Sequence, residues 1–173
     1  YEIRPRDWSS DVCSSDLAEL FADAPADLER VRSLAARTHE LTDFLVRVAR
    51  LDRVPGTFKG TVTYHDSCSG LRELGVKAQP RTLLGRMPGL TLREMNGAEQ
   101  CCGFGGTFSV KYGDISSELA NNKCVNVEAC GVDALVLGDL GCMLNIEGRM
   151  RRRGDTRTRV LHVAEVLAGA EED

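Results

Sequence analysis

The chain has 173 residues, which is enough for one domain with a hydrophobic core. Hydrophobic residues make up 42% and charged residues 28%, as in ordinary globular proteins, and no apolar run is long enough to span a membrane. The net charge of −4 argues against a nucleic-acid-binding protein, because phosphate contacts need a basic surface.

The first seventeen residues do not fit the pattern of the rest. The segment 7–17, DWSSDVCSSDL, has neither helical periodicity nor strand alternation, and it resembles the translation of a sequencing adapter. We therefore expect residues 1–17, with Trp8 and Cys13, to be non-native, a native disordered tail being the alternative. Residues 18–173 are assigned to one cysteine-rich domain with six cysteines.

The elements that follow alternate between helices and strands. Apolar residues recur every three or four positions over 26–51, which predicts one amphipathic helix. Short β-branched or alternating runs predict strands at 60–64, 90–95, 133–137 and 159–163. Helices are predicted at 69–74, 80–87, 115–129, 141–150 and after the last strand. This order predicts an α/β fold with a mostly parallel sheet of about four strands flanked by helices.

Four cysteines follow predicted strands. Cys68 comes after the first strand, Cys101 and Cys102 after the second, and Cys142 after the third, at the start of a helix. The carboxyl ends of parallel strands meet at one edge of a sheet, so we expect these thiols to lie together. Four clustered thiols can bind an iron–sulfur cluster or a structural zinc ion. Zinc ligands commonly come as CxxC pairs, which this sequence lacks, so the pattern favours a cluster.

The loop EQCCGFGG is rich in glycine. Gly103, Gly105 and Gly106 would allow backbone N–H groups to approach the cluster, because no Cβ intrudes and positive φ angles are accessible. We therefore include these glycines in the predicted cofactor-binding site. Phe104 and Phe108 are expected to pack beside the cluster and to exclude water.

A histidine and an aspartate stand just before the first cysteine of the set. His65 and Asp66 precede Cys68 by three and two positions. The imidazole could act as a proton carrier or a hydrogen-bond partner near the cluster, or it could simply be bonded to backbone at the end of a strand. No catalytic residue can be assigned from the sequence beyond these possible supporting roles.

Other polar residues have a functional and a simpler interpretation. Lys111 could offset cluster charge, although a solvated lysine is the simpler account. A run of arginines could dock a partner subunit, although a solvated helix end is more usual. The run consists of Arg149, Arg151, Arg152 and Arg153. Cys124 and Cys130 are expected to be packed thiols.

Four segments of the sequence resemble one known family. HDSCSGLRELG, EQCCGFGGTFSVKYGDIS, LGDLGCMLNIEGRM and RVLHVAEVLA look like the second cysteine-rich repeat of the CCG-domain iron–sulfur proteins, most similar to the lactate utilization protein A group. The CCG-domain subunit of heterodisulfide reductase and the glycolate oxidase iron–sulfur subunit are relatives in that family. The resemblance covers residues 18–168, and it implies the second half of a pseudo-symmetric protein whose first CCG repeat is missing from this chain.

The resemblance implies an iron–sulfur cluster bound by Cys68, Cys101, Cys102 and Cys142. The family motif ends in CxxC, and here Asn145 stands at its second position. The missing fifth cysteine argues against the non-cubane cluster of heterodisulfide reductase, and the remaining four suit a [4Fe–4S] cluster. Asn145 could hydrogen-bond a cluster sulfide or a substrate, or it could be a plain surface residue.

The resemblance also implies a role for the chain. We expect an electron-transfer subunit, non-catalytic or co-catalytic, of a multi-subunit oxidoreductase that oxidises L-lactate to pyruvate. Its partners would be the other subunits of that complex, and it would be cytoplasmic or peripheral at the inner membrane through those subunits. The alternatives are a heterodisulfide reductase-like subunit, a glycolate oxidase iron–sulfur subunit and a structural zinc-binding module.

Overall fold

The computed structural model of the chain describes residue 17 and residues 20–169. The segment expected to be non-native therefore lies outside the described residues except for Leu17, and Trp8 and Cys13 lie outside them too. None of the helices in the described part is long and apolar enough to cross a bilayer.

Four parallel strands form one sheet in the order β2-β1-β3-β4. They are β1 (Gly60–His65), β2 (Leu90–Leu92), β3 (Ala134–Leu137) and β4 (Arg159–His162). His65 pairs with Leu137, and Leu137 pairs with His162, so the carboxyl ends of three strands lie level. The predicted α/β class is confirmed, and the loops after β1 and β3 leave the sheet side by side.

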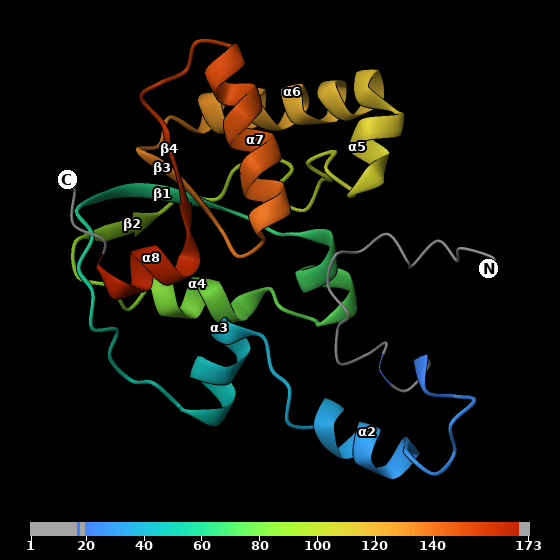
Figure 1. Cartoon of the computed structure of the whole chain (residues 1–173). Helices are drawn as coiled ribbons and strands as arrows, with labels where there is room; N and C mark the ends of the chain where they lie inside the picture. The colour runs from blue at the N-terminus through green and yellow to red at the C-terminus, as the bar shows by residue number, and fades with distance from the viewer. Residues whose placement is uncertain (1–16, 18–19, 170–173) are drawn as a thin grey trace.

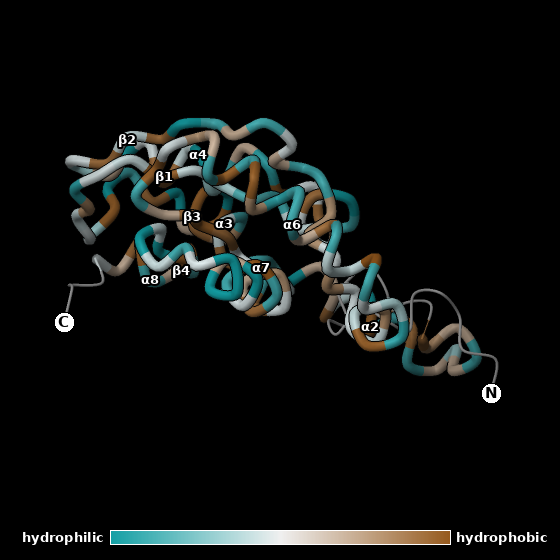
Figure 2. The backbone as a smooth tube through the Cα atoms, turned by 90° about the horizontal axis from the view of Figure 1, so that it is seen from above, coloured by the Kyte–Doolittle hydropathy of each residue, from teal (hydrophilic) through white to brown (hydrophobic). Residues whose placement is uncertain are grey.

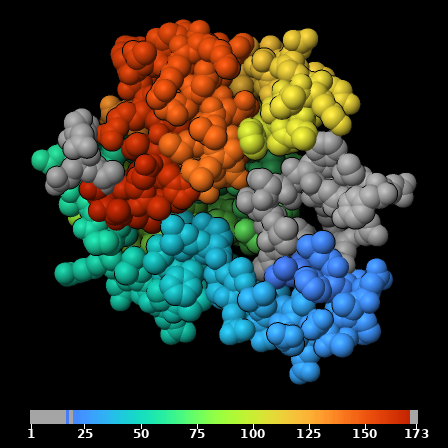
Figure 3. Space-filling view, viewed as in Figure 1, coloured from blue at the N-terminus to red at the C-terminus, as the bar shows by residue number. Residues whose placement is uncertain are grey.

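Helices cover both faces of the sheet. Helices α6 and α7 lie on one face, with α5 leading into α6, and α4 and α8 lie on the other (Figure 1). The helices are α2 (Leu28–Ala35), α3 (Leu41–Asp43), α4 (Ala78–Leu84), α5 (Thr107–Lys111), α6 (Gly113–Cys130), α7 (Leu140–Arg152) and α8 (Val163–Ala168), with π-helical segments η2 (Phe44–Val48) and η3 (Ser69–Glu73). In the space-filling view, the segment that contains α2 lies at the margin opposite the α6–α7 block (Figure 3).

Strand β3 separates two hydrophobic cores. Its side chains point to alternate faces, as the strand period requires. Ala134 and Val136 belong to the core shared with α4 and α8, whereas Leu135 and Leu137 belong to the core shared with α6 and α7. All four are completely buried. Figure 2 shows this apolar strand between the surrounding helices.

The prediction of one helix over 26–51 is wrong. The chain leaves the first helix after Ala35, and Thr38 Oγ1 donates to the Leu34 carbonyl at 2.9 Å. A second start follows at Glu40, whose carboxylate accepts the Asp43 N–H at 2.9 Å. Polar side chains that bind backbone groups therefore divide a segment whose apolar periodicity continues through the break.

The second strand is shorter than the predicted range 90–95. It ends at Leu92, because the Met95 N–H donates to the Thr63 hydroxyl at 3.1 Å instead of extending the backbone ladder. The chain then turns away from the sheet into the loop that carries Cys101 and Cys102. Because β2 ends at Leu92, the backbone that follows it can approach the carboxyl end of β1.

Candidate metal centre

Four thiols meet at the carboxyl edge of the sheet. Cys101 interacts with Cys68 and with Cys102 closely enough to shift the pKa values of these thiols, and the Cys142 sulfur lies within 4.8 Å of the Cys102 sulfur. Cys102 and Cys142 are buried, and the other two are half-buried. The structure therefore brings together the four cysteines that the sequence singled out, from the segments after β1 and β2 and from the first turn of α7.

Asp139 fixes the start of α7 at this site. Its Oδ1 accepts the Cys142 N–H at 2.8 Å, which makes Asp139 the N-cap of the helix. Its Oδ2 accepts a hydrogen bond from Ser69 Oγ at 3.4 Å. Because Ser69 directly follows Cys68, one carboxylate ties the loop after β1 to the loop after β3.

The contacts among the thiols place negative charge on one sulfur. Hydrogen bonds from Cys102 and Cys68, together with the Gly103 N–H, lower the pKa of Cys101. The pKa values of Cys68 and Cys102 are raised, first by their hydrogen bonds to Cys101 and then by burial. The protein without metal therefore keeps protons at this site, and metal binding must displace them.

The glycine loop brings backbone donors to the sulfurs. The Gly103 N–H donates to Cys101 Sγ at 3.3 Å, and Gly103 has a φ of 88°. A Cβ on this residue would lie 2.5 Å from the Ser116 carbonyl oxygen, so only glycine fits here. Gly105 and Gly106 also have positive φ angles, but they form the turn into α5, where Gly105 faces Phe108.

The two aromatic residues of the loop have different places. Phe104 packs against the core that includes Cys102 and Cys142, and its ring lies so close to Gly141 that a Cβ there would overlap it. Phe108 instead pairs with Tyr112, with ring centroids 5.4 Å apart. Phe104 therefore covers the site, whereas Phe108 packs farther along the loop.

His65 lies at this edge of the sheet, and its imidazole ring is close to two of the thiols. The residue is completely buried, and its Nδ1 lies 3.1 Å from the Ala98 carbonyl oxygen. Among the described residues its Nε2 has no hydrogen-bond partner, and the ligand atoms of His65, Cys102 and Cys142 lie within 4.8 Å of one another. Burial, and then the charge of Lys123, lowers the pKa of His65 to about 4, so the ring is neutral near pH 7.

Lys123 is a buried cation that the sequence analysis missed. Its side chain is completely buried in α6, and Nζ donates to the Gly97 and Ala98 carbonyls at 2.5 and 3.2 Å. Burial lowers the pKa of Lys123, while its interaction with the nearby thiols, Cys102 first, acts in the opposite direction. The helical periodicity of the sequence could have indicated this residue, because Lys123 falls between Ala120 and Val127 on the buried side of the helix, where an apolar residue is usual.

Several other predicted residues are bound within the chain. Asn145 Nδ2 donates to the Cys102 carbonyl at 2.9 Å, so this side chain holds a cysteine backbone and is not a plain surface residue. Cys124 is fully buried in the core, and Cys130 Sγ lies 3.8 Å from the Arg93 carbonyl oxygen. Lys111 is exposed at the end of α5.

Three of the four arginines at the end of α7 contact groups of this chain. Arg149 donates to Asn121 at 2.5 Å, Arg151 pairs with Glu147 at 2.5 Å, and Arg153 pairs with Glu128 at 2.9 Å. These contacts support the simpler interpretation of the run as a helix end.

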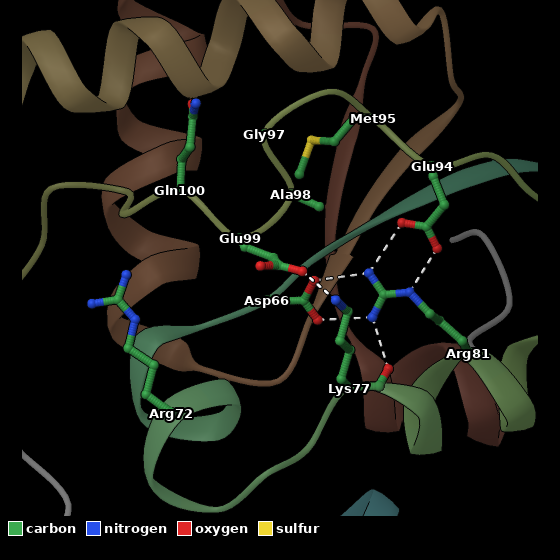
Figure 4. Close-up of a pocket in the computed structure, with 10 residues that line it drawn as sticks. All are labelled: Asp66, Arg72, Lys77, Arg81, Glu94, Met95, Gly97, Ala98, Glu99 and Gln100. Atoms are coloured by element: carbon green, nitrogen blue, oxygen red, sulfur yellow. Dashed lines mark hydrogen bonds and ion pairs between the residues drawn. The ribbon is translucent and has the colours of Figure 1, made fainter.

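A charged pocket of about 590 Å³ lies beside the loop 97–100 (Figure 4). Arg81 forms two hydrogen bonds of 2.8 Å with the buried carboxylate of Asp66 and also binds Glu94. Lys77 pairs with Glu99. Because carboxylates of the pocket itself neutralise these cations, the pocket offers a balanced charge rather than an anion site. Asp66 is thus part of a structural ion pair.

Comparison with known proteins decides the family. The model of the CCG cysteine-rich domain matches residues 62–147, a range that holds all four cysteines of the site. Proteins named lactate utilization protein A are similar over most of the chain. The relative from Lysinibacillus sphaericus is 44% identical over 149 residues, which is 86% of this chain and 65% of the relative. The relative from Geobacillus thermodenitrificans is 45% identical over 161 residues, which is 91% of this chain and 67% of the relative.

The chain belongs to the CCG cysteine-rich domain family. The predicted resemblance is confirmed. The Bacillus subtilis lactate utilization protein A is 43% identical over 148 residues, 86% of this chain and 62% of the relative. This CCG chain thus spans about two thirds of the length of these relatives. No solved structure matches it.

The residues of this CCG domain fit an iron–sulfur group. Clusters are bound by thiolates, and four thiols are in contact here. Backbone N–H groups near the sulfurs, such as that of Gly103, and a buried cation at Lys123 offset negative charge. A buried nitrogen of His65, which has no hydrogen-bond partner in the described part of the chain, remains beside the thiols.

Proposed function

We propose that this chain is the iron–sulfur electron-transfer subunit of a multi-subunit oxidoreductase that oxidises lactate. Cys68, Cys101, Cys102 and Cys142 bind its cluster, which we take to be [4Fe–4S]. The observation that carries the proposal is the interaction among four thiols contributed by the segments after β1 and β2 and by the first turn of α7. Support for lactate comes from the name that the relatives share. Other subunits of the complex supply and accept the electrons.

The residues around the thiols have separable tasks. The cluster, when bound, supplies reversible one-electron transfer. Asp139 holds the start of α7 in place through the Cys142 N–H, and Gly103 presents its own N–H to the Cys101 sulfur. Lys123 offsets the negative charge of the thiolates from inside the protein. Phe104 shields the site from water, which influences a cluster potential.

Anaerobic reconstitution tests this function. The full chain would be incubated with iron and sulfide, desalted, and assayed for iron, acid-labile sulfide and zinc. We expect iron and sulfide in equal amounts, and loss of most of both in each of the four cysteine-to-serine variants. Cys130→Ser is the matched control, because this half-buried thiol lies beside Arg93 and away from the site. A chain that binds only zinc contradicts the proposal.

A zinc site is the second candidate, and one observation favours it. The ligand atoms of His65, Cys102 and Cys142 lie within 4.8 Å of one another, which also suits a single ion. Zinc without sulfide, at one ion per chain and unchanged by offered iron, would select this candidate.

A further inference from the structure

The side chain of His65 is arranged as a metal ligand would be. It is completely buried at the end of β1, where its ring lies close to Cys102 and Cys142. Burying an imidazole nitrogen without a partner costs free energy, because the lost hydrogen bond to water is not replaced. Within the described part of the chain, Nε2 of His65 has no such partner. This unpaired atom needs an explanation.

The second ring nitrogen determines what Nε2 can do. Nδ1 lies 3.1 Å from the Ala98 carbonyl oxygen, which can only accept a hydrogen bond. Nδ1 therefore carries the proton, and Nε2 of the neutral ring carries a lone pair. Histidine ligands of metals in proteins commonly have this arrangement, in which a backbone carbonyl fixes the tautomer and the other nitrogen binds the ion.

Cys102 and Cys142 offer sulfur beside the His65 ring, and two polar side chains of this region are bound elsewhere. Asn145, which is near Cys102 in space, donates its amide to the Cys102 carbonyl. Lys123 Nζ is bound to the Gly97 and Ala98 carbonyls. Bonds of roughly 2.0–2.3 Å from a metal to nitrogen and sulfur place such ligand atoms about 3 to 4 Å apart. The observed limit of 4.8 Å is short enough for the imidazole nitrogen to share one iron with Cys102 or with Cys142 after small side-chain movements, while the other cysteine binds a second iron of the cluster.

We infer that His65 binds one iron of the cluster directly through Nε2, so that this iron has five ligands: three sulfides, one thiolate and the imidazole nitrogen. The inference rests on the proposed function, since it concerns the same cluster, and it changes the donor set of that cluster from sulfur alone to sulfur and nitrogen. A neutral nitrogen donor adds no negative charge to the centre. Replacement by cysteine would add one, so we expect the His65→Cys variant to have a more negative reduction potential.

Pulsed electron paramagnetic resonance tests the ligand. The full chain, reconstituted anaerobically, would be reduced and compared with protein that contains ¹⁵N-imidazole histidine. We expect a strong ¹⁴N coupling that converts to ¹⁵N on labelling and disappears in His65→Asn. Asparagine can still donate to the Ala98 carbonyl from near the position of Nδ1 and lacks only the ring nitrogen. His39→Asn, at a histidine beside Asp43 in the N-terminal segment, should keep the coupling.

Mössbauer spectroscopy of ⁵⁷Fe gives a second measurement that needs no paramagnetic state. One iron site should differ from the others in the wild type, and this difference should vanish in His65→Asn. A chain that holds iron and sulfide, but shows neither nitrogen coupling nor a distinct iron, overturns the inference and leaves the proposed function standing. A chain that holds no iron and sulfide overturns both.

Discussion

The ammonium group of Lys123 donates to the carbonyl oxygen of Ala98 at 3.2 Å, deep inside the protein. The same oxygen lies 3.1 Å from Nδ1 of His65 and accepts the Asp66 N–H at 3.1 Å. One carbonyl thus joins the buried ammonium group of Lys123, the imidazole ring of His65 and the end of β1. This arrangement places a positive charge next to thiols that must become thiolates to bind metal.

Replacement of Lys123 by methionine should lower the reduction potential of the bound cluster. The substitution keeps much of the side-chain volume but removes a buried positive charge, which favours the more negative, reduced state. A titration monitored by electron paramagnetic resonance measures the shift. Lys59→Met is the control, because Lys59 is exposed just before β1, at the end of that strand away from His65. An unchanged potential in Lys123→Met would show that the charge of the lysine does not act on the cluster.

Substitution of Gly103 by alanine should disrupt the site. The added Cβ would meet the Ser116 carbonyl oxygen at 2.5 Å, on a residue whose φ is 88°. We expect a loss of about 1–3 kcal/mol in the free energy of unfolding, and a reduced yield of reconstituted cluster. Urea unfolding and an iron assay measure the two effects. Gly148→Ala is a matched control, because nothing lies within 4 Å of the added methyl group in α7; it should stabilise the protein by about 1 kcal/mol.

Loss of the α7 cap should loosen the position of Cys142. Asp139→Ala removes the acceptor of the Cys142 N–H, and we expect a cost of about 1 kcal/mol, with faster loss of iron to a chelator. Asp27→Ala is the comparison, since Asp27 precedes α2 but makes no side-chain cap bond. Equal destabilisation by both variants would mean that the Asp139 contact contributes nothing specific.

The stability of the chain should fall at alkaline pH because of Cys124. Burial raises the pKa of this thiol from 9.0 to about 11. Between these pH values the unfolded chain loses the proton and the folded chain keeps it. The contribution of this thiol to the free energy of unfolding is therefore complete below pH 9 and is lost as the pH rises toward 11. For one proton, the change cannot exceed about 1.4 kcal/mol per pH unit. Urea unfolding at pH 8, 9 and 10 should show a shallower decline for Cys124→Ala than for the wild type.

Much of the site was visible in the sequence because it follows from strand order. Each cysteine of the set stands after a strand, and a parallel sheet collects the ends of its strands at one edge. The break before Glu40 was not visible, since the apolar period continues across it and only the side-chain bonds of Thr38 and Glu40 interrupt the helix. The bare nitrogen of His65 was also hidden, because its tautomer depends on a carbonyl 33 positions away.

Native mass spectrometry of the anaerobically reconstituted chain tests the central claim most directly, because the added mass identifies both the metal and the sulfide. We expect the wild type and Cys130→Ser to carry the mass of four iron and four sulfide atoms, and Cys142→Ser to lose it. A wild-type chain that carries a single zinc ion, or a Cys142→Ser chain that retains the full cluster mass, would contradict an iron–sulfur cluster bound by these four thiols.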